Sequence, residues 1–254
     1  ADAVGLAQLD EERLGAAFQV SSTNPLVGLA GRVTLLQKLA HALEKSPELF
    51  GNDLPRPGHL VDYLLTQAQD GTLPASTILK AILQGLGDIW PGRITLAGIP
   101  LGDVWLHPKL PDTEPGSQLV PLHKLSQWLT YSLLEPLQDL GLTIADLNTL
   151  TGLAEYRNGG LFVDLGVLVP KHDGVLSQAH TPDSGVIVEW RALTVILLDQ
   201  VANAIRQTLN LSAVELPLAK VLQGGTWTAG RQTAVTKRPG GPPPIQLASD
   251  GTVF

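Results

Sequence analysis

Three polar side chains follow one another at the start of the segment EYRNGG, which runs from Glu155 to Gly160. Neighbouring residues of a helix or turn point in different directions, so at least one of Glu155, Tyr156 and Arg157 must face the interior. A buried charge needs a charged or hydrogen-bonding partner, because an unpaired one is costly in a low dielectric. The inward-facing residue of the three therefore needs a partner, and for Glu155 the alternatives are a carboxylate aimed at a ligand and a buried ion pair between two helices.

A second carboxylate, Asp164, interrupts the apolar run that follows the two glycines. An acid in such a run is either paired or functional, since an ionised and unpartnered carboxylate is unfavourable there. Asp164 is accordingly a candidate catalytic residue. A helix cap or a structural pair with a nearby arginine is the alternative for it.

A candidate wall for a binding pocket lies in the segment HKLSQWLTYSLLEPL. Lys124, Gln127, Trp128 and Tyr131 are spaced i, i+3, i+4 and i+7, which places them on one face of a helix. That face would offer a substrate a cation, an amide and aromatic rings. The same spacing also describes a solvent-facing stripe in which Trp128 is half buried under the stem of Lys124.

Two further charged residues, Glu189 and Arg191, stand at the head of a long and nearly charge-free helical pattern. An acid in a first helical turn complements the helix dipole, which would explain Glu189. Arg191 has no such explanation. We expect it to pair with a buried carboxylate such as Glu155 or Glu189, or to hold an anionic ligand.

The segment from Gln223 to Arg231, and the sequence KRPGGPPP after it, are rich in glycine and basic residues. A phosphate cradle built from turns and basic side chains would have this composition, and so would an exposed loop. We count Trp227 and Arg231 among the candidate substrate-binding residues. Neither the P-loop pattern nor Gly-x-Gly-x-x-Gly occurs, which disfavours hydrolysis of nucleoside triphosphates.

Composition excludes several classes of function. The 254 residues include 24 acidic and 17 basic side chains, and the net charge of -7 disfavours a nucleic-acid partner. Cysteine is absent, which rules out a thiolate nucleophile, a disulfide and a sulfur-ligated metal. The histidines lack i, i+4 spacing, and we expect neither a metal nor a cofactor. No apolar run reaches the ~18 residues of a membrane span, so we expect a cytoplasmic protein without a membrane partner.

Apolar residues recur at helical spacing in several stretches, whereas alternating patterns are short. We predict helices over residues 10–18, 33–43, 58–69, 76–86, 122–137, 189–209 and 216–222. We predict strands over residues 93–96, 161–169, 244–247 and 252–254, and surface loops over 107–121 and 171–185. The chain should therefore be mainly α with a few short strands, in a single helical domain covering residues 1–254.

Long segments of the sequence resemble a known family. FQVSSTNPLVGLAGR, EYRNGGLFVDLGVL, VEWRALTV and LAKVLQGGTWTAGR are similar to segments of the domain-of-unknown-function 1688 family, whose fungal members are uracil catabolism protein 4. Members of that family usually carry a further N-terminal portion. The resemblance therefore implies that residues 1–254 are the C-terminal part of a longer family member.

Three shorter patterns resemble the queuosine salvage family of nucleotide N-glycosidases, whose fold is helical and DNA-glycosylase-like. They are Lys124-x-x-Gln127, Glu155-Tyr156-Arg157 and Glu189-x-Arg191, in the same order along the chain. In that family the acid before Tyr-Arg is an aspartate with a catalytic role, whereas this chain has Glu155. The resemblance implies a helical, DNA-glycosylase-like fold and places Glu155 at the bond that is broken.

Together the two resemblances imply an N-ribosyl hydrolase of uracil catabolism with a small-molecule substrate. Cleavage of an N-glycosidic bond develops positive charge on the sugar carbon, which a carboxylate such as Glu155 can stabilise. We expect ribosylurea 5'-phosphate, or a related ring-opened pyrimidine nucleotide, to be split into urea and a sugar phosphate. The alternatives are a metal-dependent amidohydrolase with zinc near Asp103, His107 or His123, and a non-catalytic scaffold subunit of the uracil pathway.

The other candidate residues would bind this substrate. Arg157 and Arg191 would keep the acid or its neighbours ionised, and Lys124 or the basic segment could take the 5'-phosphate. Aromatic side chains could pack against the sugar or a planar leaving group, and the candidates are Trp128, Tyr156 and Trp227.

Overall fold

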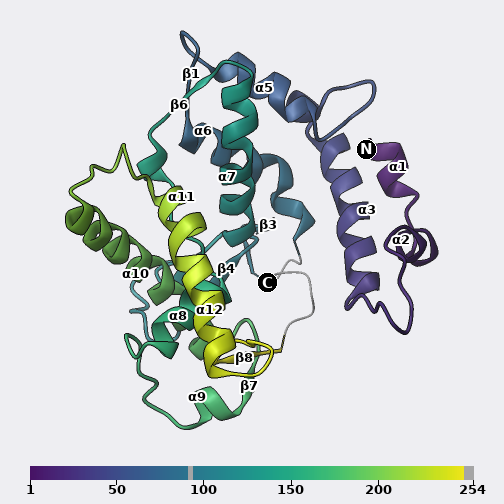
Figure 1. Cartoon of the computed structure of the whole chain (residues 1–254). Helices are drawn as coiled ribbons and strands as arrows, with labels where there is room; N and C mark the ends of the chain where they lie inside the picture. Colours follow the sequence, from purple (N-terminus) through teal and green to yellow (C-terminus); the bar gives the residue numbers. More distant parts are fainter. Residues whose placement is uncertain (91–93, 249–254) are drawn as a thin grey trace. The chain divides into compact units, whose positions relative to one another are not determined.

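A computed structural model describes residues 1–90 and 94–248, whose backbone is mainly helical with short two-stranded sheets (Figure 1). The prediction of a mainly α chain with a few short strands is confirmed. The likeness to a DNA-glycosylase fold stays a prediction. None of the described helices is long and apolar enough to cross a membrane.

The chain gathers into two compact units. In the described part, the first unit comprises residues 1–103 and 132–146, and the second unit comprises residues 104–131 and 147–248. Helix α7 (Lys124–Asp139) supplies residues to both. A single domain over residues 1–254 remains a prediction, but all the candidate catalytic and substrate-binding residues belong to the second unit.

Helices make up most of the first unit, and short strand pairs complete it. The helices are α1 (Ala3–Ala7), α2 (Glu11–Ala17), α3 (Leu29–Lys45), α4 (Pro47–Phe50), α5 (His59–Gln67) and α6 (Ala75–Leu86), followed by a 3₁₀ turn at Gly87–Ile89. The strands are β1 (Thr72–Pro74), which pairs in parallel with β6 (Thr143–Ala145), and β2 (Thr95–Leu96), which pairs antiparallel with β3 (Ile99–Pro100).

Helix α3 shows how the sequence determines these elements. Its apolar residues recur at helical spacing, and Val33, Ala40 and Leu43 are buried. The helix ends at Lys45, because a proline disfavours helical backbone angles in the residue before it, here Ser46. The predicted helix over residues 33–43 is therefore confirmed.

Helices also dominate the second unit. They are α8 (Tyr156–Asp164), α9 (Gly174–Ser177), α10 (Gly185–Leu209), α11 (Leu218–Val221) and α12 (Trp227–Lys237), with a 3₁₀ turn at Leu147–Thr149 and a π-helical turn at Leu222–Thr226. The strands are β4 (Val104–Leu106), which pairs antiparallel with β5 (Leu119–Pro121), and β7 (Ala179–His180), which pairs in parallel with β8 (Gln246–Leu247).

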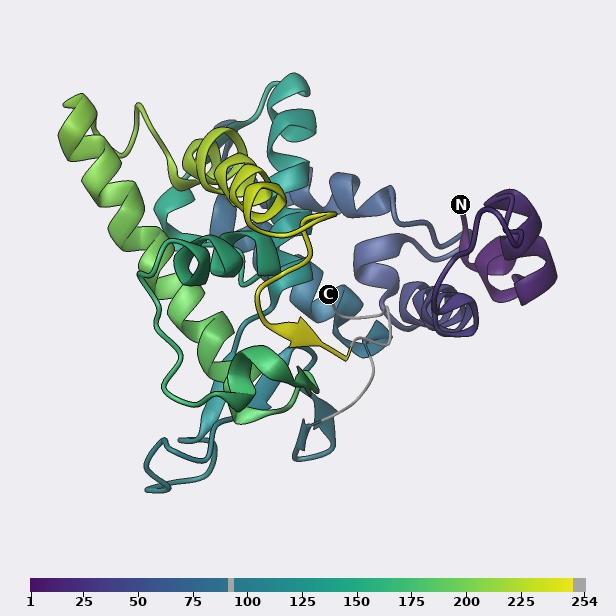
Figure 2. The same cartoon turned by 60° about the horizontal axis from the view of Figure 1, so that its bottom comes forward.

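An apolar cluster joins the helices of the second unit. Phe162 of α8, Leu198 and Ala202 of α10, and Leu218 and Val221 of α11 are buried in it. Helix α8 packs against both α10 and α12, as Figures 1 and 2 show. Burial of each large apolar side chain contributes about 1.5–3 kcal/mol, so these contacts fix α8 within the unit.

The predicted strand over residues 161–169 is wrong. Its first half belongs to helix α8, and Gly166 then turns the chain with a φ of 74°. Gly159 and Gly160 suggested a break between elements, but they lie inside the helix. Their missing side chains let neighbouring groups approach the backbone of α8 closely, which a pattern of apolar residues does not reveal.

The interpretation of residues 223–231 as turns or an exposed loop is also wrong. Two consecutive glycines usually interrupt regular structure, but the π-helical turn contains them and α12 follows without a gap. Leu222, Thr226, Gly230 and Ala234 are buried at four-residue intervals. One continuous helical face therefore stays on the interior of the unit.

Other predictions differ mainly at the ends of the elements. Helix α10 begins at Gly185 rather than Glu189, because Ser184 caps it by accepting a hydrogen bond from the backbone N–H of Ile187. The strands predicted over 93–96 and 244–247 shorten to β2 and β8. Arg93 and residues 252–254 lie outside the described residues. The loop over 107–121 ends in β5, and the loop over 171–185 contains α9 and β7.

Candidate functional site

Buried polar side chains concentrate in the second unit. Within residues 1–90 and 94–248, the buried polar residues all belong to it, and they are Lys124, Ser126, Gln127, Thr130, Glu155, Asn158, Arg191, Thr194 and Thr226. Burial of a polar group costs free energy unless a partner compensates it. We call these nine residues the polar network of the second unit, and four of them were predicted from the sequence.

Glu155 caps helix α8. Its backbone is extended, and its carboxylate folds over the first turn, where it accepts hydrogen bonds from the backbone N–H groups of Arg157 (2.8 Å) and Asn158 (2.6 Å). Only 6% of the residue is exposed. The N–H groups and the dipole of a helix N-terminus both favour a carboxylate there. The prediction that one of the three consecutive polar side chains faces inward is confirmed for Glu155.

Burial governs the electrostatics of Glu155. Loss of hydration raises the pKa of its carboxyl above the usual value. The hydrogen bonds from the backbone N–H groups of Arg157 and Asn158, and then the positive charges of Lys124 and Arg157, oppose this rise. The site therefore holds a desolvated carboxyl whose ionised form is supported from several sides.

Tyr156 and Arg157 stack on each other beside this carboxyl. The Arg157 guanidinium carbon lies 4.8 Å from the centroid of the Tyr156 ring, and Nη1 donates a hydrogen bond to the backbone oxygen of Gly241 at 2.6 Å. A ring and a carbonyl thus hold the guanidinium in place. Tyr156 remains 38% exposed and can contact a ligand.

The predicted face of helix α7 supports the segment that leads to Glu155. The phenol of Tyr131 donates a hydrogen bond to the backbone oxygen of Thr151 at 2.9 Å, and Oε1 of Gln127 accepts one from the backbone N–H of the same residue at 3.4 Å. Burial raises the pKa of the Tyr131 phenol, and the charge of Asp199 adds to the rise. These bonds tie α7 to the approach to α8.

Of the four residues on the predicted face of α7, only Trp128 is exposed as a solvent-facing stripe would require. Lys124 and Gln127 are buried, whereas Trp128 is 46% exposed. The amino group of Lys124 acts electrostatically on Glu155 and favours its ionised form. The structure therefore brings the cation of this face near the candidate carboxylate, while the amide binds the segment that precedes it.

Arg191 and Glu189 lie on different sides of helix α10. Arg191 is 3% exposed, and its Nε donates a hydrogen bond to the backbone oxygen of Ala154 at 3.2 Å, directly before Glu155. The Glu189 side chain is 63% exposed and lies 3.8 Å from Nε2 of His107. Because α10 begins earlier than predicted, Glu189 is not in its first turn, and the helix dipole does not explain it.

Asp164 forms a structural ion pair with Arg238. Two hydrogen bonds of 2.6 Å join the guanidinium to the two carboxylate oxygens, and the Asp164 side chain is 4% exposed. The hydrogen bonds to Asp164 raise the pKa of Arg238. At 1.5 Å per residue, Asp164 lies about 14 Å along α8 from the Glu155 cap. The two candidate carboxylates therefore stand at opposite ends of one helix.

Helix α12 meets the first turn of α8 through a glycine. A Cβ atom placed on Gly230 would lie 2.2 Å from the backbone oxygen of Arg157. Trp227 and Arg231, on either side of this contact along α12, stack on each other at 4.8 Å, and Trp227 is 37% exposed. Trp227 and Arg231 therefore flank the residue through which α12 contacts the first turn of α8.

Several residues of the network had no signal in the sequence. A Cβ on Gly159 would lie 2.8 Å from Nε1 of Trp190 and 2.6 Å from Oγ1 of Thr194, so α10 packs directly on the backbone of α8. Oδ1 of Asn158, Nε1 of Trp190 and Oγ1 of Thr226 are buried without a hydrogen-bond partner in the described part of the chain. Only the Gly-Gly pair hinted at this close packing.

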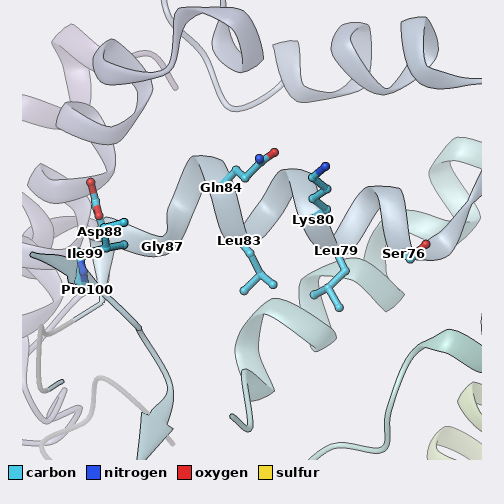
Figure 3. A pocket seen from close by; sticks show the side chains of 9 residues that line it. All are labelled: Ser76, Leu79, Lys80, Leu83, Gln84, Gly87, Asp88, Ile99 and Pro100. Carbon is cyan, nitrogen blue, oxygen red and sulfur yellow. The ribbon is translucent and has the colours of Figure 1, made fainter. Parts of the chain in front are cut away.

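A pocket of about 450 Å³ lies in the first unit, along helix α6 (Figure 3). Leu79 and Leu83 point to one side of the helix, Lys80 and Gln84 point to another, and Ile99 stands near one end. No candidate catalytic or substrate-binding residue lines this pocket. It is therefore separate from the polar network of the second unit.

The histidines that the structure describes form no metal-binding cluster with acids. Across residues 1–90 and 94–248, no group of three or more His, Cys, Asp or Glu side chains is placed to hold a metal ion. Nε2 of His180 contacts the backbone oxygens of Gly174 and Val175 at 3.2 and 3.1 Å. His107, named for the zinc-dependent alternative, lies beside Glu189.

Comparison with known proteins gives a family and two curated relatives. The chain is 41% identical over 280 residues to uracil catabolism protein 4 of Lachancea kluyveri, an alignment that covers 98% of this chain and 62% of that protein. It is 38% identical over 257 residues to protein urg3 of Schizosaccharomyces pombe, covering 100% of this chain and 61% of that protein. The chain thus spans about six tenths of the length of these relatives. Residues 1–254 match the family described as protein of unknown function DUF1688, and the chain belongs to that family.

Proposed function

We propose that this protein is an N-ribosyl hydrolase that acts in uracil catabolism on a ring-opened pyrimidine nucleotide. The simplest such substrate is ribosylurea 5'-phosphate, in which a urea nitrogen replaces the nitrogen of the base. Two kinds of support lead to it. One relative is named for uracil catabolism, and the second unit holds a buried carboxyl close to cations and half-exposed aromatic rings.

In the proposed reaction, water replaces urea on the sugar. The bond between C1' and the urea nitrogen breaks, its electron pair stays on the nitrogen, and the nitrogen takes up a proton. The water oxygen bonds to C1' and loses a proton. The products are urea and ribose 5-phosphate. C1' becomes cationic as the bond breaks, so the transition state gains from a negative charge held beside it.

Glu155 has the properties that this role requires. A carboxylate has about four lone-pair positions, and the two backbone N–H groups of α8 occupy one on each oxygen. Burial strengthens the attraction between the carboxylate and a developing cation, because the local dielectric is low. The same burial raises the pKa of Glu155, while Lys124 and Arg157 favour its ionised form.

Neighbouring residues would keep this carboxylate in a reactive position. Gln127 and Tyr131 bind Thr151, and Arg191 binds the backbone oxygen of Ala154. The chain just before Glu155 is thus fixed from α7 and α10. Accurate placement matters, because a misplacement of about 1 Å can cost roughly 10²-fold in rate.

The exposed aromatic rings of the site suit a sugar or a planar leaving group. Tyr156 and Trp227 are 38% and 37% exposed, and each carries a guanidinium on one face. Sugars and ureas both have flat or apolar faces that pack against such rings. These side chains are the proposed contacts for the part of the substrate that lies outside the buried carboxyl.

The buried carboxyl of Glu155 is the observation that carries this proposal, and urea release tests it. Purified protein is incubated with synthetic ribosylurea 5'-phosphate, and urea and ribose 5-phosphate are measured. We expect equal amounts of both, and we expect Glu155→Gln to slow their release by about 10²-fold or more. A folded preparation that releases no urea would refute the proposal. Release of ammonia in place of urea would favour the amidohydrolase alternative.

A further inference from the structure

The chain is acidic overall, but one segment of the second unit is basic. Between Leu216 and Ala248 the sequence has no Asp or Glu and carries the cations Lys220, Arg231, Lys237 and Arg238. This segment forms α11, the π-helical turn, α12 and β8, and it packs on α8. A concentration of positive charge against the helix that carries Glu155 indicates an anionic ligand.

Two of these cations already have structural partners. Arg238 forms the ion pair with Asp164, and its Nε also donates to the backbone oxygen of Pro242 at 2.9 Å. Nζ of Lys220 donates to the backbone oxygen of Glu215 at 3.3 Å. The contacts of Arg238 and Lys220 within the chain therefore explain their presence without a ligand.

Lys237 and Arg231 differ in their position on α12. Lys237 lies in the last turn, where a cation complements the helix dipole without any ligand. Arg231 lies mid-helix, where no such explanation applies. Among the described residues, no hydrogen bond or ion pair engages its guanidinium, which rests on the face of the Trp227 ring at 4.8 Å.

The stacking on Trp227 holds the Arg231 guanidinium in a position that favours binding of an anion. A guanidinium that lies flat on a ring keeps the N–H groups at its edge free to donate, and their geometry matches two oxygens of a phosphate. The ring also limits the motion of the side chain, so less entropy is lost when an anion binds. Gly230, the preceding residue, lies against the carbonyl of Arg157, so α12 contacts the turn that Glu155 caps at the residue directly before Arg231.

We infer that Arg231, stacked on Trp227, binds the phosphate monoester of the substrate and so selects a sugar phosphate over the unphosphorylated sugar. This inference rests on the proposed function, because it concerns the same site. It assigns the phosphate to α12 and leaves Lys124 to support Glu155. The substrate is accordingly a nucleotide rather than a nucleoside.

Product binding tests this inference without requiring turnover. Isothermal titration of the whole protein with ribose 5-phosphate, and separately with ribose, compares wild type, Arg231→Ala, Arg231→Lys and Lys237→Ala. Lys237→Ala is the matched control, because it removes the same charge from the same helix. Circular dichroism and thermal melting confirm that each variant is folded, as expected for substitutions at exposed helical positions.

We expect wild type and Lys237→Ala to bind ribose 5-phosphate at least tenfold more tightly than ribose. We expect Arg231→Ala to lose about tenfold to hundredfold in affinity for ribose 5-phosphate, with no change for ribose. Arg231→Lys should recover only part of the loss, because an ammonium lacks the planar fork. Equal affinity in wild type and Arg231→Ala, or an equal loss in Lys237→Ala, would overturn the inference.

The two proposals fail in different ways. If ribose 5-phosphate binds through Arg231 but no urea is released from ribosylurea 5'-phosphate, the hydrolase proposal fails and the phosphate site stands. If wild type and Arg231→Ala release urea at equal rates from ribosylurea and from its 5'-phosphate, the phosphate site is wrong and the hydrolase proposal stands.

Discussion

The contact between Gly230 and Arg157 allows the sharpest prediction about the packing of the site. A Cβ atom on Gly230 would lie 2.2 Å from the backbone oxygen and 2.9 Å from the backbone carbon of Arg157. A close carbon–oxygen contact is about 3.3 Å, so Gly230→Ala creates an overlap of about 1 Å. The backbone of α12 fixes the position of this Cβ, and the atoms it meets belong to the backbone of α8, so no side-chain rotation relieves the overlap. Helix α12 must therefore move away from α8.

The free-energy cost of moving α12 away from α8 can be estimated. Inserting one extra carbon into a packed interior costs about 1–3 kcal/mol, and an overlap with a backbone carbonyl that cannot rotate away belongs at the upper end. Alanine in place of glycine favours a helix by about 1 kcal/mol. We therefore expect Gly230→Ala to lower the free energy of unfolding by about 2 kcal/mol. We also expect slower urea release, because Trp227 and Arg231 move with the helix.

Urea denaturation of Gly230→Ala and Gly224→Ala measures this effect. Gly224 is the matched control, because a Cβ there would meet no atom within 4 Å and its φ is not positive. We expect Gly224→Ala to be as stable as wild type or slightly more stable. If the two variants have the same free energy of unfolding, α12 does not touch the carbonyl of Arg157 as described.

Four further predictions concern the carboxyls and the phenol. Arg238→Ala leaves the buried Asp164 carboxylate unpaired and should cost about 3 kcal/mol in thermal or chemical unfolding; a stability equal to that of wild type would contradict the structural role of this pair. The pH dependence of kcat/KM should show a loss of activity as the pH falls through the raised pKa of Glu155, because the protonated acid no longer stabilises a cation; a flat profile from neutral pH down to the usual range of a carboxyl would contradict it. The folded state binds the Glu155 proton more tightly than the unfolded state does. The free energy of unfolding should therefore fall as the pH rises from the unfolded pKa of this group to its raised folded pKa, and Glu155→Gln should lack this pH dependence. Tyr131→Phe removes the hydrogen bond to Thr151 and should cost about 1 kcal/mol together with part of the activity; unchanged stability and kcat would show that this bond does not support the site.

The sequence predicted best where one physical signal acted alone. The apolar spacing around Val33 and Leu43 gave the helix that forms, and the Ser46-Pro47 step gave its end. Three adjacent polar side chains in a turn or helix predicted that at least one of them faces inward, and the structure shows that Glu155 does. Helical spacing does not tell which face of a helix is covered, so the sequence left a solvent-facing stripe and a pocket wall as alternatives for the face of α7. The burial of Lys124 disagrees with the solvent-facing stripe.

The sequence failed where distant parts of the chain decide the local structure. The run after Gly159 was predicted as a strand, since apolar residues after a Gly-Gly pair are typical of one. It forms a helix because Glu155 caps it and because Trp190 and Thr194 need the space that Gly159 leaves. Glutamate is not a common N-cap residue, so its presence gave little indication that helix α8 starts there.

The partner of Asp164 shows the same limit. The two readings of Asp164, functional or paired, could not be separated until Arg238 was placed beside it, 74 positions along the chain. The π-helical turn at residues 222–226 was likewise hidden by its two glycines, which favoured a loop. Contacts between residues far apart in sequence therefore determine both the fold of the site and the roles within it.

The rate of urea release by Glu155→Asp tests the central claim most directly. Aspartate is a better N-cap than glutamate, so this variant keeps the helix cap and should stay folded with a stability close to that of wild type. Its side chain is shorter by one methylene, which moves the carboxylate away from C1' of the substrate. We predict a fall of about 10²-fold in kcat on ribosylurea 5'-phosphate. A folded Glu155→Asp protein that releases urea at the wild-type rate would mean that Glu155 only caps helix α8.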